Sequence, residues 1–143
     1  MSGQVRHSLV SALAAVPDFA ALDDRTLLRI VGASANLVWV ADSVVFEKGS
    51  PSEALYIILT GRVRITDADL EIATLEPGDY FGELSLLLHT KHSKTATAIE
   101  DTELMVLPKE SFQELLAANA DLADHFRRKL ETRIAVPQAD KLT

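Results

Sequence analysis

The feature that most constrains the fold is a series of short apolar segments between residues 37 and 107, separated by turn signals. Within them apolar residues alternate with polar ones or run together briefly, as in half-buried and fully buried β-strands. Glycine turns most readily through positive φ, and glycines stand at the expected corners: Gly49, Gly61, Gly78 and Gly82. The pattern predicts about eight short strands, which favours an antiparallel barrel or jelly roll.

A helical pattern precedes the strand region. We expect a first helix that stops before Pro17, then a linker turn that holds Phe19, then a second helix capped by Asp23 or Asp24. Gly32 lies near the end of the second helix, where a residue at positive φ is common. The apolar stripe of this helix is predicted to be Leu27, Leu28, Ile30 and Val31.

A second helical pattern follows the strand region. Asn119-Ala120 is expected to separate two helices, and Asp121 to cap the second one. That helix carries an apolar residue at every fourth position: Leu122, Phe126, Leu130 and Ile134. The chain is therefore predicted to be a single α+β domain over residues 1–143. Its parts are helices within 8–35, a β-roll at 37–107, C-terminal helices within 109–135 and a tail at 136–143.

Charge and composition exclude several classes of function. The net charge is −7, which disfavours non-specific binding to nucleic acid or to an anionic membrane. The chain has no cysteine, so disulfides and thiolate metal sites are excluded. No apolar run approaches the ~18 residues of a membrane span. Residues 9–16 resemble the core of a signal peptide, but Ser11 interrupts them and an amphipathic helix is expected instead. We expect a soluble, cytoplasmic domain.

One stretch, residues 81–98, combines the groups that a small anionic sugar would need. Gly82-Glu83 places a carboxylate, a strong hydrogen-bond acceptor, beside a residue that lets a ligand approach closely. Lys91 and Lys94 follow, and they are the only lysines or arginines between Arg64 and Lys109. An acceptor at one end and cations at the other suit a pocket for a sugar hydroxyl and an anionic group. The alternative for the lysines is an exposed loop in which they serve solubility.

Three spaced motifs carry a resemblance to a known family. They are VVFEKGS at residues 44–50, LYIILTGRV at 55–63 and EPGDYFGELSLL at 76–87. In this order they resemble the cyclic nucleotide-binding domain of protein kinase A regulatory subunits, catabolite activator-type transcription factors and cyclic-nucleotide-gated channels. The resemblance extends over residues 9–134. It implies a jelly roll with a short cassette helix, and a non-catalytic sensor that binds cAMP or cGMP, needs no cofactor and repositions its C-terminal helices.

The resemblance also implies the binding residues. Glu83 would accept a hydrogen bond from the ribose 2′-hydroxyl, and the amides of Gly82, Glu83, Leu84 and Ser85 would meet the cyclic phosphate. The family's arginine, which forms a forked pair with the phosphate, is replaced by Lys94, and the preceding proline by Ser93. A lysine neutralises charge but cannot form the planar fork. Thr95 and Ala96 begin the small-residue strand that follows, at a place where threonine favours guanine in some members.

The substitutions leave a second interpretation open: a degenerate domain that keeps the fold, has lost the nucleotide and acts as a structural or interaction module. The chain is also compatible with the sensor half of a transcription factor or the end of a channel, although this chain alone is not expected to bind DNA. An effector or a second copy is expected to dock on the C-terminal helices. His89 and His92 lie three positions apart, but the further ligands of a metal site are missing, so no metal is expected.

Overall fold

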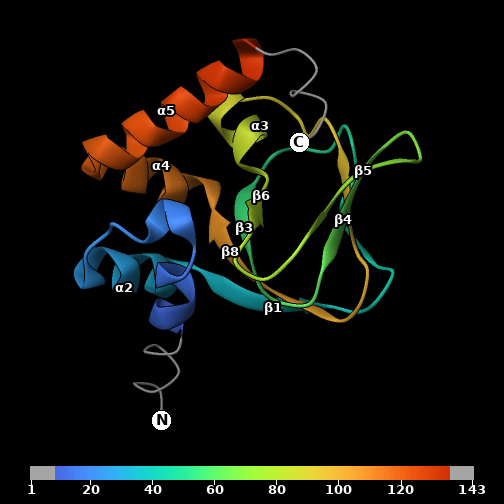
Figure 1. Ribbon diagram of the computed structural model, residues 1–143, viewed down its shortest axis with the longest axis horizontal. Coiled ribbons are helices and arrows are strands. Elements are labelled where there is room, and N and C mark those ends of the chain that lie inside the picture. Colours follow the sequence, from blue (N-terminus) through green and yellow to red (C-terminus); the bar gives the residue numbers. More distant parts are fainter. Residues whose placement is uncertain (1–8, 136–143) are drawn as a thin grey trace.

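The computed structural model describes residues 9–135, with side chains up to Glu131, as a β-roll with helices along one side (Figure 1). The strands form two four-stranded antiparallel sheets, in the orders β1-β8-β3-β6 and β2-β7-β4-β5. The strands are β1 Ala35–Trp39, β2 Val44–Phe46, β3 Ala54–Thr60, β4 Val63–Asp67, β5 Leu70–Leu75, β6 Tyr80–Phe81, β7 Thr95–Ala98 and β8 Thr102–Pro108. The prediction of an α+β jelly roll is confirmed.

The helices lie before, within and after the strands, as predicted. They are the helical residues 9–14, the 3-10 helix η1 Pro17–Phe19, α2 Asp24–Ala33, the short α3 Glu83–Leu88, α4 Lys109–Ala118 and α5 Ala120–Ala135. Asp23 caps α2, because its side chain accepts a hydrogen bond from the amide of Thr26 at 2.8 Å. In Figure 1, α2, α4 and α5 gather on one side of the roll, whereas β4 and β5 form the opposite wall.

Strands β3 and β8 are buried on both faces, which explains why β3 is a nearly continuous apolar run. Alternate residues of β3 point to opposite faces of the sheet. Leu55 and Ile57 pack against the helices, whereas Ile58 packs inside the roll. On β8, Met105 packs against the helices and Leu104 inside the roll. The molecule therefore has two apolar cores separated by one sheet.

The helical layer corrects several local predictions. Phe19, expected in a linker turn, is fully buried in η1, with its ring centroid 6.3 Å from that of Phe126. Gly32 is an ordinary helical residue of α2, and Leu28 of the predicted stripe is 46% exposed. Asp121 lies in the first turn of α5 rather than before it. The predictions for Ile134 as a packing side chain and for a tail at 136–143 fall outside the side chains and residues described.

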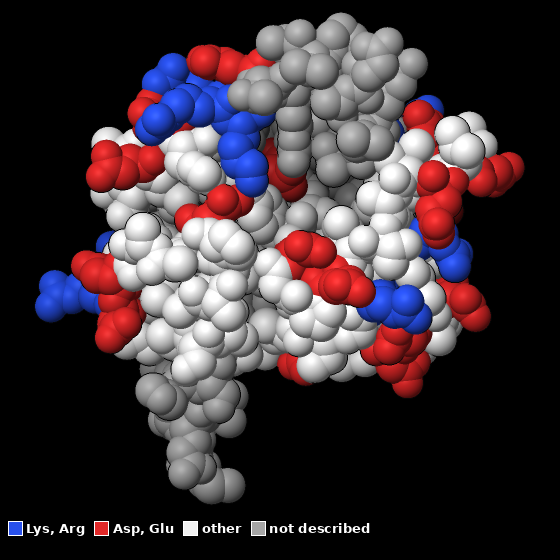
Figure 2. All heavy atoms as spheres, viewed as in Figure 1, with Lys and Arg blue, Asp and Glu red and all other residues white. Residues whose placement is uncertain are grey.

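The surface charges agree with an acidic protein. Figure 2 shows Lys and Arg side chains gathered over α5 on one face, with Asp and Glu spread over the rest. On α5, Arg127 and Arg128 are more than 60% exposed, and both form ion pairs with Asp124 on the same helix. Among residues 9–135, no helix is long and apolar enough to cross a membrane.

Candidate functional site

A cavity of about 70 Å³ opens inside the roll beside α3. Gly82, Glu83, Leu84, Ser85 and Lys94, all predicted from the sequence, contribute to its lining. The rest of the wall is largely apolar and aromatic, with Phe46, Ile65, Leu75, Tyr80 and Phe81. Residues from separate segments of the chain therefore converge on one pocket.

Gly82 connects β6 to α3 through a backbone conformation that only glycine adopts easily. Its φ is +90°, and an added Cβ would lie 3.1 Å from the carbonyl oxygen of Ala54 and 3.2 Å from the ring of Tyr56. The sharp turn starts α3 against the cavity, so that Glu83 and Ser85 are 6% and 7% exposed. The carboxylate and the hydroxyl are thus held in a largely dry wall, where hydrogen bonds and ion pairs are stronger than in water.

Lys94 reaches the cavity from the loop before β7. Its side chain is 14% exposed, and its ammonium lies 3.9 Å from Oδ2 of Asp67. Asp67 has a closer partner, because Nζ of Lys48 lies 2.7 Å from Oδ1. The hydrogen bond from Lys48 is the main reason that the pKa of Asp67 is lowered. Lys94 is therefore only loosely engaged at 3.9 Å and borders the same cavity as Glu83.

The structure does not bring the other two predicted residues to the cavity lining. Thr95 and Ala96 are the first residues of β7, where successive side chains point to opposite faces. Oγ1 of Thr95 accepts a hydrogen bond from the amide of Lys48 at 3.0 Å, outside the cavity. Ala96 is fully buried among the apolar residues of the roll interior. Neither side chain contributes to the wall that Glu83 and Lys94 share.

The sequence analysis missed His92 as a residue of this site. Its side chain is 4% exposed and lines the cavity, stacked on Phe46 with ring centroids 3.5 Å apart. Its Nδ1 lies 3.1 Å from Oγ of Ser85, and burial lowers the pKa of the imidazole. The spacing from His89 drew attention to metal binding, but His89 is exposed. Among the described residues no group of three His, Cys, Asp or Glu side chains could hold a metal ion.

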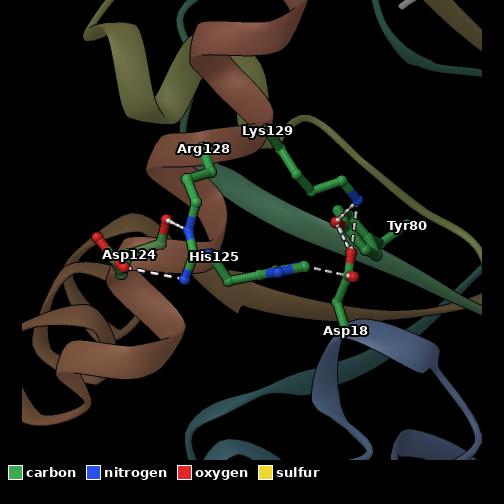
Figure 3. A network of polar contacts seen from close by, with 6 residues as sticks. All are labelled: Asp18, Tyr80, Asp124, His125, Arg128 and Lys129. Atoms are coloured by element: carbon green, nitrogen blue, oxygen red, sulfur yellow. Dashed lines mark hydrogen bonds and ion pairs between the residues drawn. The ribbon is translucent and has the colours of Figure 1, made fainter.

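A polar network joins the cavity wall to α5. Figure 3 shows Tyr80, His125 and Lys129 converging on Asp18 of η1. The Tyr80 hydroxyl donates to Asp18, Nζ of Lys129 lies 2.7 Å from Oδ2 of Asp18, and Nε2 of His125 lies 2.6 Å from Oδ1. Burial alone would raise the pKa of Asp18, but these hydrogen bonds outweigh it and lower the pKa. Tyr80 thus belongs both to the cavity wall and to the contact that holds α5.

Comparison with known proteins identifies the class of domain. The sequence matches the family model described as "Cyclic nucleotide-binding domain" over residues 37–119. This stretch begins in β1, contains the remaining strands and α3, and ends after α4. The chain belongs to the cyclic nucleotide-binding domain family, and the resemblance inferred from the sequence motifs is confirmed.

Relatives of several kinds share the domain. A cyclic nucleotide-gated potassium channel of Rhizobium etli is 31% identical over 127 residues, which cover 88% of this chain and 36% of the channel. The cyclic AMP receptor protein of Thermus thermophilus is 39% identical over 77 residues, covering 50% of this chain and 36% of that protein. The chain thus spans about a third of the length of both relatives.

A solved structure matches over nearly its whole length. The sensor domain of the transcriptional regulator DNR from Pseudomonas aeruginosa aligns with a TM-score of 0.84 and 21% identity, over 92% of this chain and 91% of that one. At this identity the likeness concerns the fold. The same arrangement of a β-roll and helices therefore occurs as a sensor domain in at least one other protein.

Proposed function

We propose that this chain is a non-catalytic, cytoplasmic sensor domain that binds cAMP or cGMP inside the roll and relays its occupancy to α4 and α5. The observation that carries the proposal is that Glu83 and Lys94, from separate segments, line the same cavity. A carboxylate accepts hydrogen bonds from sugar hydroxyls, and an ammonium group pairs with a phosphate. The aromatic wall of Phe46 and Phe81 offers apolar surface to the remainder of a nucleotide.

The relay is supported by the double role of Tyr80. Tyr80 belongs to the cavity lining, while its ring packs with Phe19 and Phe126 of the helical layer and its hydroxyl and Asp18 bind Lys129 of α5. A ligand can shift α5 only if it binds one arrangement of the helix more tightly than another. A nucleotide that displaces Tyr80 meets this condition, because the hydroxyl would lose its contacts with α5. An effector domain or a second copy of the chain would then sense the change at α5.

The proposal is tested by isothermal titration of cAMP and cGMP into the wild-type chain, Glu83→Gln and Glu76→Gln. We expect a dissociation constant below about 1 mM for the wild type. Glu83→Gln should weaken binding by roughly tenfold to a hundredfold, because it removes a charge-assisted hydrogen bond. Glu76 is exposed and outside the cavity lining, so Glu76→Gln should bind as the wild type does.

The same titration decides the alternative function. The alternative is a domain that has kept the fold and lost the nucleotide, and its support is that Lys94 stands in place of the arginine and Ser93 in place of the proline. If neither nucleotide binds below about 1 mM, the sensor function is wrong and a structural or interaction role takes its place.

A further inference from the structure

His92 contains a buried nitrogen that no described group satisfies. The side chain is 4% exposed, and its Nε2 has no hydrogen-bond partner. Buried polar atoms are nearly always paired, and leaving one unpaired costs free energy. The ring belongs to the lining of the cavity, together with Phe46 and Ser85, the two residues that it contacts. An unpaired donor or acceptor beside a ligand cavity indicates a contact that forms when the cavity is filled.

The position of the ring is fixed by several contacts. It stacks on Phe46 with an interplanar angle of 4°, and its Nδ1 faces Oγ of Ser85. Its backbone is held as well: the amide of Gly49 donates to the His92 carbonyl at 2.8 Å, and the His92 amide donates to the Ser50 carbonyl at 3.0 Å. Nε2 is therefore unpaired in a ring whose position is fixed by its neighbours.

We propose that His92 is a second phosphate-contacting residue, which acts with Lys94 in place of the single forked guanidinium. The inference rests on the proposed function, since the anion is the cyclic phosphate of the nucleotide. Lys94 supplies a point charge from the loop, and His92 supplies a directed N–H from a rigid ring two residues earlier. Together they restore two separate donors for the two exocyclic oxygens of the phosphate.

The arrangement couples binding to a proton. Oγ of Ser85 lies 3.4 Å from the Gly82 carbonyl and 3.1 Å from Nδ1 of His92, and we assign the hydroxyl proton to the carbonyl, so that Nδ1 donates to Oγ. In the neutral ring Nε2 is then an acceptor, and it must gain a proton before it can donate to an anion. Burial lowers the pKa of His92 in the empty site, and a bound phosphate raises it.

The direction of the pH dependence follows. Affinity is greatest below the pKa of the empty site, falls as the pH rises through the higher pKa of the bound site, and then levels off. The charged side chains on the segments around His92 are Glu83 on α3, Lys91 and Lys94 on its own loop, and Glu47 and Lys48 beside the loop of Gly49. Carboxylates and lysines ordinarily titrate outside the range between about pH 5.5 and pH 8. Histidines ordinarily titrate within this range, so proton uptake is assigned to His92 by its loss in a variant that lacks this ring.

The experiment is a titration of cAMP and cGMP into the wild type between about pH 5.5 and pH 8, in pairs of buffers that differ in ionisation enthalpy. We expect net proton uptake on binding and an affinity about tenfold higher at the acidic end. His92→Gln, whose amide reaches the Nε2 position without titrating, should remove both effects. His89→Asn is the control, because His89 is exposed and asparagine tolerates its φ of 55°. His89→Asn should show the same proton uptake on binding and the same change of affinity with pH as the wild type.

The outcomes separate the two proposals. Nucleotide binding without proton uptake, and with the same affinity in His92→Gln, overturns the role of His92 and leaves the sensor function standing. No binding at any pH overturns both. If His92→Gln does not fold, His92→Asn is titrated in its place, because it also removes the titrating imidazole, and proton uptake that persists in it overturns the role of His92.

Discussion

The two ends of the cavity are constructed differently. At the Glu83 end, the backbone sets the geometry: Gly82 turns through positive φ, and α3 begins directly beside the cavity. At the Lys94 end, His92 and Lys94 line the cavity from a loop, and the backbone is held by ordinary hydrogen bonds. The first end therefore tolerates few substitutions, whereas the second can change its side chains without changing the fold. The replacement of arginine by lysine lies at the second end.

The largest effect on stability should come from Gly82→Ala, which changes the backbone at the Glu83 end of the cavity. The new Cβ forces an L-residue to φ +90° and lies 3.1 Å from the Ala54 carbonyl. We expect a loss of about 3 kcal/mol in the free energy of unfolding, measured by urea denaturation. Gly49→Ala, at the same φ but in open space, should cost about 1–2 kcal/mol. Equal losses would show that close packing at Gly82 contributes nothing.

A smaller effect, confined to ligand affinity, is expected from Lys94→Arg at the side-chain end. A guanidinium offers two parallel donors to a phosphate, so affinity should rise about tenfold in a calorimetric titration. Lys91→Arg is the matched control, because Lys91 is exposed and outside the cavity lining. An unchanged affinity for Lys94→Arg would remove Lys94 from the phosphate contact.

Asp18→Asn tests how much the contact of Asp18 with Tyr80 and α5 contributes to the stability of the fold. At neutral pH we expect a loss of about 1–2 kcal/mol in the free energy of unfolding, because Lys129 and His125 lose a charged acceptor. The pKa of Asp18 is lowered in the folded state, so its contribution is present above the ordinary pKa of 3.8 and disappears as the pH falls through the folded value. Urea denaturation at neutral and acidic pH should show the difference from wild type narrowing in acid. Asp121→Asn, an exposed position, should show no such difference.

The smallest effect should come from Thr95→Val, on the outer side of the wall. Thr95 bonds the amide of Lys48 rather than lining the cavity, so the ratio of cAMP to cGMP affinity should change by less than about twofold. Competition between the two nucleotides measures this ratio. A large loss of cGMP binding alone would place Thr95 in contact with the base after all.

Local signals in the sequence predicted the roll well. Alternating side chains on β4 and β5 depend only on neighbours in the chain, and the turn between them carries Ala68 and Asp69 at positive φ, as a tight hairpin requires. The corner at Gly82 was found in the same way. Glu83 followed from the motif at residues 76–87, and Lys94 from the small-residue strand that begins directly after it.

Residues whose roles depend on distant partners escaped prediction. Phe19 looked like a turn residue because Phe126, one of the rings around it, lies in the last helix. His92 looked like a loop residue because Phe46 and Ser85 come from β2 and α3. In both cases the neighbouring sequence is unremarkable, and the environment arises only when separate segments come together.

The sheet that separates the two apolar cores has a consequence for how the molecule loses its structure. Because β3 and β8 contribute side chains to both cores, neither the roll nor the helical layer retains a complete core once the other has melted. The domain should therefore behave as one cooperative unit with a single thermal transition. A ligand held only by the roll would raise the melting temperature of the helices by the same amount.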